Sequence, residues 1–493
     1  MSFLIKRKEI IKNNLEKIYN KYYDEKQYIE YQIIEKVIEK VRVIDGKVKE
    51  QYSIRNEMGL QCRVYYNGGV GISHTTYMNE EDYELTYLEA KKISQLMSKI
   101  SDINAIHPKK MDDLEDLSRN WKDCLIKEKE TILKEASIIA SNLGYAYSCD
   151  LSYTKTTEIN VYGNSNGVYK IFNICNDTLF QRIYASKGME RKYYLNRVCT
   201  KPNELFYNQT YLNQFIQIGK LCVEKLFQSV NTLPLLEVAC DYIVVDNGLL
   251  GMIVHEAFGH SLEGDSIIKG LSNVICKYYG KKIASNQINI VANSQMKNCG
   301  ERIVDAEGNH AMDTFLVKDG ILVDFMHNGQ SSFILEQETN GHSINESYYV
   351  NPLVRMSSIY MLPKNIEPNV EVHTWNIDSV KKLLIEKGII AEKNKVYYLF
   401  DWSGGTTDWR KLTFNISVPF CYILSKNEQD ILINNVSFIG NSIELFMDYY
   451  TSYGKIKVDS IGFCLKMQQM VKTSDGGPML TVFKNSSNFI IDK

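Results

Sequence analysis

Five ionisable residues lie within one stretch of eleven residues: His255, Glu256, His260, Glu263 and Asp265. The apolar run LLGMIV, residues 249–254, comes directly before them. A chain seldom buries such groups unless they pair with one another or bind a metal ion. The stretch therefore predicts a metal site rather than a helix with a solvated polar face.

The spacing of the two histidines differs by one residue from the HExxH pattern of zinc peptidases. In HExxH both imidazoles lie on one face of a regular helix. Here, five steps of about 100° set His255 and His260 about 140° apart around a straight helix. Gly259, directly before the second histidine, tolerates a π-bulge or an early helix end that would turn His260 back. We therefore expect a distorted helix between these histidines.

Glu256 is the candidate catalytic residue of this motif. If the histidines bind zinc, Glu256 lies beside the first ligand, where a general base for the attacking water belongs. A catalytic zinc has three protein ligands and one open position. The local sequence leaves the third ligand open between Glu263 and a residue elsewhere in the chain.

The elements that must position the motif are a buried strand and an apolar helix. Residues 242–245 form a short apolar run typical of a strand, and Asp246 and Asn247 are good N-cap residues for the helix that follows. Many short strands are predicted after the motif: 288–291, 315–317, 321–325, 397–399, 414–418, 421–424 and 436–439. Such frequent strands separated by turns indicate a curled, mostly antiparallel sheet.

The part of the chain before the motif combines helices and strands. Helical periodicity is found at 87–100, 127–141 and 205–230, and strand patterns at 53–73 and 145–184. The sequence NTLP at 231–234 interrupts the last helix and marks a domain boundary. We therefore predict an α+β protein. It has an N-terminal helix-flanked sheet domain at 1–232 and a C-terminal, barrel-like β domain at 233–493 that carries the HExxxH helix.

The composition excludes several classes of protein. A net charge of −2 over 493 residues gives no electrostatic basis for binding nucleic acid or an anionic membrane. No apolar segment is long enough for a membrane span, and the N-terminus lacks the apolar region of a signal peptide. The eleven cysteines include no CxxC pair, which favours reduced thiols in the cytoplasm.

The full motif, HEAFGHSLEGD, resembles the TldD/PmbA family of metallopeptidases, in particular its catalytic, TldD-like subunit. Further segments match that family in the same order: RIVDAEG at 302–308, FLVKDGILVDF at 315–325, RMSSIY at 355–360, CLKMQQ at 464–469 and GGP at 476–478, the last as a turn. Leu465 and Gln468 stand where the family pattern CGKxGQ has glycine.

The resemblance assigns roles to individual residues. It implies that His255, His260 and Cys464 bind one Zn²⁺ per catalytic subunit and that Glu256 is the base. Glu263 then becomes a neighbour of the ligands. The candidates for substrate binding are Arg355, Glu263, Asp265 and His327. An arginine at 355 suits a peptide carboxylate or carbonyl because its guanidinium donates two parallel hydrogen bonds.

The resemblance also implies an activity and a partner. The expected function is zinc-dependent hydrolysis of unfolded or extended peptides, in peptide maturation, leader removal or degradation, with the substrate paired along an edge of the catalytic sheet. The expected partner is a homologous non-catalytic subunit or a second copy of the chain. Two alternatives remain: a non-catalytic peptide-binding subunit, and a zinc hydrolase of non-peptide amides.

Overall fold

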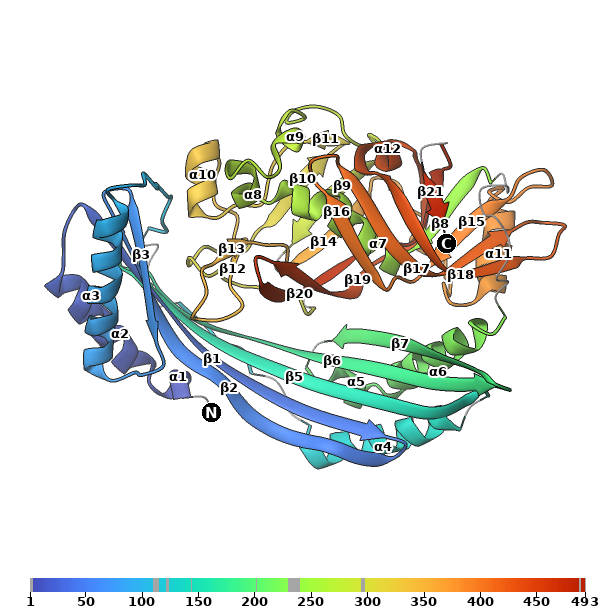
Figure 1. Ribbon diagram of the computed structural model, residues 1–493, viewed down its shortest axis with the longest axis horizontal. Helices are drawn as coiled ribbons and strands as arrows, with labels where there is room; N and C mark the ends of the chain where they lie inside the picture. Colours follow the sequence, from blue (N-terminus) through green and yellow to red (C-terminus); the bar gives the residue numbers. More distant parts are fainter. Residues whose placement is uncertain are drawn as a thin grey trace.

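The structure is a computed structural model that describes residues 3–109, 115–120, 124–142, 144–200, 202–228, 240–293, 298–486 and 489–492. The predicted domain boundary at 231–234 lies outside the described residues. Two large sheets dominate the described chain, one in each half (Figure 1). The predicted α+β class is confirmed, whereas the domain limits remain a prediction.

The N-terminal sheet has seven strands in the order β3-β2-β1-β5-β6-β4, with β7 paired to β6. Their bounds are β1 Gln27–Ile44, β2 Lys47–Tyr66, β3 Gly69–Thr75, β4 Glu115–Leu117, β5 Ala146–Asn164, β6 Tyr169–Lys187 and β7 Glu190–Thr200. Asn67 and Gly68 both have positive φ, as the tight hairpin turn between β2 and β3 requires. The strand pattern predicted at 145–184 corresponds to β5 and most of β6.

Helices lie around this sheet. They are α1 Phe3–Lys6, α2 Lys8–Lys21, α3 Glu80–Met97, α4 Ile126–Ser141, α5 Glu204–Tyr207 and α6 Gln209–Lys225. The helix predicted at 205–230 is two helices, because Asn208 ends the first and caps the second. Its side chain accepts a hydrogen bond from Tyr211 N at 3.1 Å.

The C-terminal sheet has twelve strands in the order β11-β10-β9-β14-β20-β8-β15-β17-β18-β21, with β16 on β17 and β19 on β20. Their bounds are β8 Tyr242–Asp246, β9 Ile288–Asn293, β10 Asp313–Lys318, β11 Ile321–Leu322, β14 Ser358–Pro363, β15 Val396–Phe400, β16 Gly404–Asp408, β17 Thr413–Leu424, β18 Ile431–Asn441, β19 Tyr449–Lys466, β20 Gln469–Lys484 and β21 Ile490–Asp492. Most pairs are antiparallel, as predicted, but β14 with β20 and β8 with β15 are parallel. The curled sheet confirms the barrel-like prediction.

Shorter elements complete this half: β12 Ser343–Ile344, β13 Leu353–Val354, α7 Asn247–Val254, α8 Gly264–Ile268, α9 Asn273–Cys276, α10 Gly329–Leu335, α11 Ile377–Glu386 and α12 Ser442–Met447. Two predictions need correction. The strands expected at 414–418 and 421–424 are one strand, β17, which continues through Pro419. The segment GGP at 476–478 is not a turn but lies inside β20, and the turn between β19 and β20 is at Met467 and Gln468.

The two halves share a hydrophobic core. One buried cluster joins Val198 of β7 and Phe215 of α6 to Val244 of β8 and Tyr398 of β15. The long N-terminal strands run beneath the C-terminal half, and β7 lies on the side nearest to it (Figure 1). The site in the C-terminal half therefore has a wall from the N-terminal sheet.

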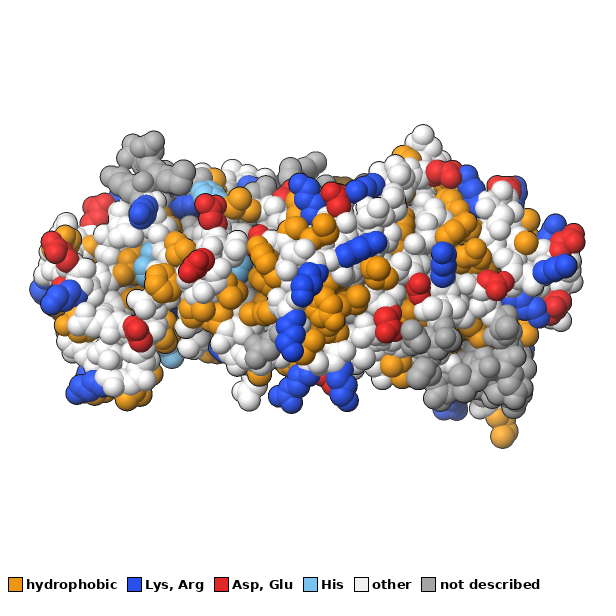
Figure 2. Space-filling model, turned by 90° about the horizontal axis from the view of Figure 1, so that it is seen from above, with side chains coloured by type: hydrophobic (Ala, Val, Ile, Leu, Met, Phe, Trp, Pro, Cys, Tyr) orange, Lys and Arg blue, Asp and Glu red, His pale blue; other side chains and the backbone are white. Residues whose placement is uncertain are grey.

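The surface of the C-terminal half carries charges of both signs. Figure 2 shows acidic and basic side chains distributed over this face, with hydrophobic side chains exposed between them. In the part of the chain that the structure describes, no helix is long and apolar enough to cross a membrane.

Candidate metal centre

The motif helix is distorted where the histidine spacing requires it. Asp246 caps α7 by accepting a hydrogen bond from Leu249 N at 3.1 Å. The α-helix ends at Val254, a π-helical turn spans His255–Gly259, and a 3₁₀ turn begins at His260. The prediction of a distorted helix is confirmed. The wider π turn brings the second imidazole round to the side of the first.

Gly259 is required by packing as well as by the helix. A Cβ built on it would lie 1.8 Å from Sδ of Met356, a side chain buried beside the π turn. Gly251 has a similar role on α7, because its Cβ would lie 2.5 Å from the backbone N of Gly476. The helix therefore rests directly on β20 and reaches Asp475.

Three donor side chains converge at the end of this helix. One ligand atom from each of His255, His260 and Cys464 lies within 4.8 Å of the other two, and this is the one such group in the described part of the chain. Cys464 Sγ is 3.4 Å from His260 Nε2. The two imidazole rings are 5.0 Å apart between centroids, with an angle of 81° between their planes.

Carboxylates hold both imidazoles in place. Nδ1 of His255 is 3.0 Å from Asp475 Oδ2, and Nδ1 of His260 is 3.4 Å from Glu263 Oε2. A carboxylate that accepts a hydrogen bond from Nδ1 fixes the orientation of the ring and leaves Nε2 to bind the metal. Metal-binding histidines commonly have this arrangement.

A buried lysine balances the acids behind the ligands. Lys466 Nζ lies 3.0 Å from Glu263 Oε2 and 2.6 Å from Asp265 Oδ1, and it donates to Val354 O at 3.0 Å. Burial alone would raise the pKa of Glu263, but Lys466 and His260 lower it to about 2. Glu263 is therefore charged at any physiological pH.

Electrostatics favour the thiolate of Cys464. Burial opposes ionisation, but the adjacent His260 and His255 hold the pKa of the thiol well below its usual value. A thiolate and two imidazoles oriented by carboxylates form a donor set that fits Zn²⁺. The residues present could therefore hold this ion.

The substrate-binding candidates lie behind the ligands. Arg355 is fully buried and donates through Nη2 to Cys464 O and through Nη1 to Gln469 O, which clamps the two strands of the β19–β20 hairpin. Glu263 and Asp265 are buried against Lys466, as described above. His327 is also buried, with Nδ1 3.2 Å from Ser331 Oγ. None of the four lines the cavity beside the metal centre.

That cavity has a volume of about 720 Å³ and is lined by all three donors and by Glu256. Gly405 of β16 lies against Glu256, because a Cβ built on it would be 3.0 Å from Glu256 Cγ. Trp409 lines the same cavity, with its ring centroid 6.5 Å from that of His260. This arrangement can polarise a carbonyl, hold an anion and move a proton.

Sequence reasoning missed several residues of the site. Asp475 gives no local signal, because it acts on a residue far away in the chain, and Lys466 has a signal only as part of the CLKMQQ segment. Met356 was noted only as part of the RMSSIY segment. Gly405 could have been identified from the sequence, because a pair of glycines such as 404–405 is typical of a place where another group approaches the backbone closely.

The chain is similar to known proteins in both sequence and structure. The family described as the PmbA/TldA metallopeptidase C-terminal domain matches residues 241–485. A metalloprotease of Methanothermobacter thermautotrophicus is 26% identical over 442 residues, which cover 89% of this chain and 90% of that protein. A zinc metalloprotease TldD homolog of Saccharolobus solfataricus is 28% identical over 49% of this chain and 50% of its own length. TldE of Thermococcus kodakarensis has a similar fold, with a TM-score of 0.70 and 13% identity over 98% of this chain and 100% of that chain.

Proposed function

This chain belongs to the TldD/PmbA family of metallopeptidases, and from that premise we propose that it is a zinc-dependent peptidase that hydrolyses extended peptides. The observation that carries the proposal is the convergence of His255, His260 and Cys464 beside a buried glutamate on a common cavity. A purely structural metal site would need neither the glutamate nor the cavity.

We assign the metal to His255, His260 and Cys464, one zinc ion per chain. When bound there, zinc supplies a Lewis acid that polarises the scissile carbonyl and stabilises developing negative charge. Asp475 and Glu263 orient the imidazoles, and Lys466 neutralises the acids behind them.

Glu256 is the general base in this mechanism. Its carboxylate accepts a proton from the attacking water and later delivers that proton to the leaving amine. Gly405 leaves room for this side chain, because a Cβ at position 405 would lie 3.0 Å from Glu256 Cγ. Arg355 keeps Cys464 in place by binding its carbonyl oxygen.

The peptide binds along β16 in this proposal. Among the described strands, β16 pairs only with β17, and the residues from Gly404 to Thr407 line the cavity. An extended peptide can therefore add as a further strand through backbone hydrogen bonds, next to Glu256. This mode reads backbone rather than side chains and requires an unfolded substrate.

The setting of the enzyme is also part of the proposal. All eleven cysteines are free thiols, which suits a reducing cytoplasm. We also propose assembly with a homologous subunit or a second copy of the chain. Light scattering of the purified chain, alone and with a co-expressed homologue, tests this assembly.

Replacing Glu256 with glutamine tests the catalytic proposal. We expect the Glu256→Gln variant to retain zinc and thermal stability but to lose peptide cleavage, because the amide cannot accept the proton. Zinc content and mass spectrometry of a peptide mixture before and after incubation are the measurements. Undiminished cleavage by this variant would remove Glu256 from the mechanism. Wild-type protein that cleaves non-peptide amides but no peptide would favour a different zinc hydrolase.

A further inference from the structure

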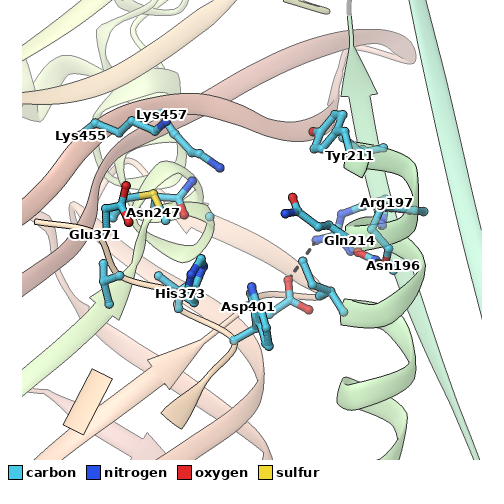
Figure 3. Close-up of a pocket in the computed structure, with 18 of the residues that line it drawn as sticks. Asn196, Arg197, Tyr211, Gln214, Asn247, Glu371, His373, Asp401, Lys455 and Lys457 are labelled. Atoms are coloured by element: carbon cyan, nitrogen blue, oxygen red, sulfur yellow. Dashed lines mark hydrogen bonds and ion pairs between the residues drawn. The ribbon is translucent and has the colours of Figure 1, made fainter. Parts of the chain in front are cut away.

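Strand β7 holds the N-terminal sheet against the C-terminal half. With α6 it lines one side of a cavity of about 650 Å³, and residues 368–375 and β19 lie on the other side (Figure 3). Arg197 of β7 crosses this join, because its guanidinium lies 3.8 Å from the centroid of the Trp402 ring and donates to Trp402 O at 2.6 Å. Side chains two residues apart on a strand point to the same face, so Cys199 faces the C-terminal half as well.

Cys199 meets Cys299, a cysteine of the C-terminal half. The two side chains form a buried cluster of their own, and their thiols share a hydrogen bond. The proposed peptidase mechanism uses neither residue. Contact between two sulfur atoms is the first geometric requirement of a disulfide. The pair could therefore form a covalent link between the two halves.

The turn that carries Cys299 is held in place by the C-terminal half. Asn298 Nδ2 donates to Val458 O at 3.0 Å, and Gly300 N donates to Asn298 Oδ1 at 3.0 Å. Gly300 is packed so closely that a Cβ built on it would lie 1.8 Å from Ser357 O. The position of Cys299 opposite β7 is therefore fixed by contacts on both of its sides.

The surroundings of Cys299 favour its thiolate. Its Sγ is 2.8 Å from Ser474 Oγ and 3.2 Å from Thr473 O. Burial opposes ionisation, but the hydrogen bonds from Cys199 and Ser474 and the positive charge of Lys472 lower the pKa of Cys299 below its usual value. For Cys199, burial raises the pKa well above its usual value. The pair therefore combines a nucleophilic sulfur with a protonated thiol.

A small cavity lies beside Cys299 at the join of the two halves. It has a volume of about 230 Å³, and its lining includes Cys299, Lys472, Thr156 of β5 and Asn345. Lys472 Nζ donates to Asn176 Oδ1 at 2.8 Å, which fixes the ammonium group next to the cavity. A cavity of this size has room for several water-sized molecules, so a small oxidant fits whereas a protein oxidant does not.

We propose that Cys199 and Cys299 are a site of reversible oxidation, at which hydrogen peroxide forms a disulfide that links the two halves of the protein. The Cys299 thiolate attacks one peroxide oxygen, which breaks the O–O bond, forms a sulfenic acid and releases hydroxide. The sulfur of Cys199 then attacks the sulfenic sulfur, and the hydroxyl group leaves with the Cys199 proton as water. The proton that Cys299 gave up converts the hydroxide into a second water. Both sulfurs are oxidised and both peroxide oxygens are reduced.

The disulfide would act as a clamp on the fold. It joins the end of β7 to the turn at residues 298–300 and restricts the unfolded chain over the long segment between the two cysteines. We therefore expect the oxidised protein to melt about 5 °C higher than the reduced protein. This inference goes beyond the proposed peptidase activity and does not depend on it.

Peptide mapping of the zinc-loaded, full-length protein tests the inference. The protein is treated with a slight molar excess of hydrogen peroxide, blocked with N-ethylmaleimide, digested without reduction and examined by mass spectrometry. We expect two peptides joined through Cys199 and Cys299, with a loss of two of the eleven free thiols. Dithiothreitol should reverse both changes.

A second pair of cysteines serves as the internal control. Cys240 and Cys421 are close enough to interact electrostatically, but both lie in the C-terminal half and burial raises the pKa of each thiol. We expect this pair to stay reduced under the same treatment, because it lacks a thiolate.

Serine variants separate the roles of the two sulfurs. In Cys199→Ser, Cys299 should stop at the sulfenic acid, which dimedone labels, and the melting temperature should not rise on oxidation. In Cys299→Ser, Cys199 should be neither crosslinked nor labelled. Melting temperatures of the reduced variants show whether they are folded, and the mapping of the wild-type protein stands without them.

Two results of the mapping would overturn the inference. One is the absence of the crosslink at peroxide concentrations that oxidise other thiols of the chain. The other is an equal yield of the Cys240–Cys421 crosslink, which would show that oxidation follows unfolding. Equal melting temperatures of the crosslinked and reduced wild-type protein would refute the clamp. Because no step involves a substrate, a failure of the peptidase proposal leaves all of these results unchanged.

Discussion

Replacing Gly405 with alanine is expected to impair catalysis without removing the metal. A Cβ at this position would lie 3.0 Å from Cγ, 3.1 Å from Oε1 and 3.3 Å from Cδ of Glu256. The glutamate side chain must therefore shift by a few tenths of an ångström. A displacement of a catalytic group by about 1 Å can cost roughly 100-fold in rate. For a smaller shift we expect kcat to fall about tenfold, which corresponds to about 1.4 kcal/mol in the activation free energy.

The neighbouring glycine provides a matched control. Gly404 is on the same strand, but a Cβ built on it meets nothing within 4 Å. Gly404→Ala and Gly405→Ala share the backbone effects of losing a glycine and differ only in the contact with Glu256. The assay is kcat with a saturating fluorogenic peptide, together with zinc content and melting temperature. Equal kcat values for the two variants, whether high or low, would refute the positioning of Glu256 by Gly405.

Three further variants test the supports of the site. Asp475→Asn should weaken zinc binding about 10- to 100-fold in a chelator competition, because the carboxylate no longer orients His255; an unchanged affinity would contradict this. Gln468→Gly should stabilise the protein by about 0.5–1 kcal/mol in thermal unfolding, because Gln468 has a φ of +66° in the β19–β20 turn; a lower melting temperature would be the opposite of this expectation. Burial and the nearby Asp401 raise the pKa of Asp246 from 3.8 to about 7, so its contribution to stability is present at low pH and is lost as the pH rises towards 7. Asp246→Asn keeps the cap but cannot ionise. Its free energy of unfolding relative to wild type should therefore rise between pH 5 and pH 8, by roughly 3 kcal/mol at most. Parallel curves of unfolding free energy against pH for the two proteins would exclude this titration.

The distortion of the motif helix followed from local geometry. His255 and His260 are five steps apart, and a glycine precedes the second. This leaves few ways to bring the two rings together, and the π turn at His255–Gly259 is one of them. Helix periodicity also located α4 closely, because its buried face repeats at helical spacing. These features depend on residues close together in the sequence.

Other parts of the site depend on contacts that no local pattern contains. Cys464 lies some two hundred residues from His260 and was found only through the resemblance to a family. The glycines at 476 and 477 suggested a turn, but they lie in β20 because α7 packs on them at Gly251. Arg355 was a candidate for substrate binding, but its guanidinium is fully buried against the β19–β20 hairpin. The sequence alone does not show this burial.

The most direct measurement is X-ray absorption at the zinc edge of the purified wild-type protein and of Cys464→Ser. We expect one zinc per chain, with one sulfur neighbour at about 2.3 Å and imidazole nitrogens at about 2.0 Å. The sulfur signal should disappear in the variant. Zinc surrounded only by nitrogen and oxygen in the wild-type protein, or a sulfur signal that survives in Cys464→Ser, would contradict the assignment of His255, His260 and Cys464 as its ligands.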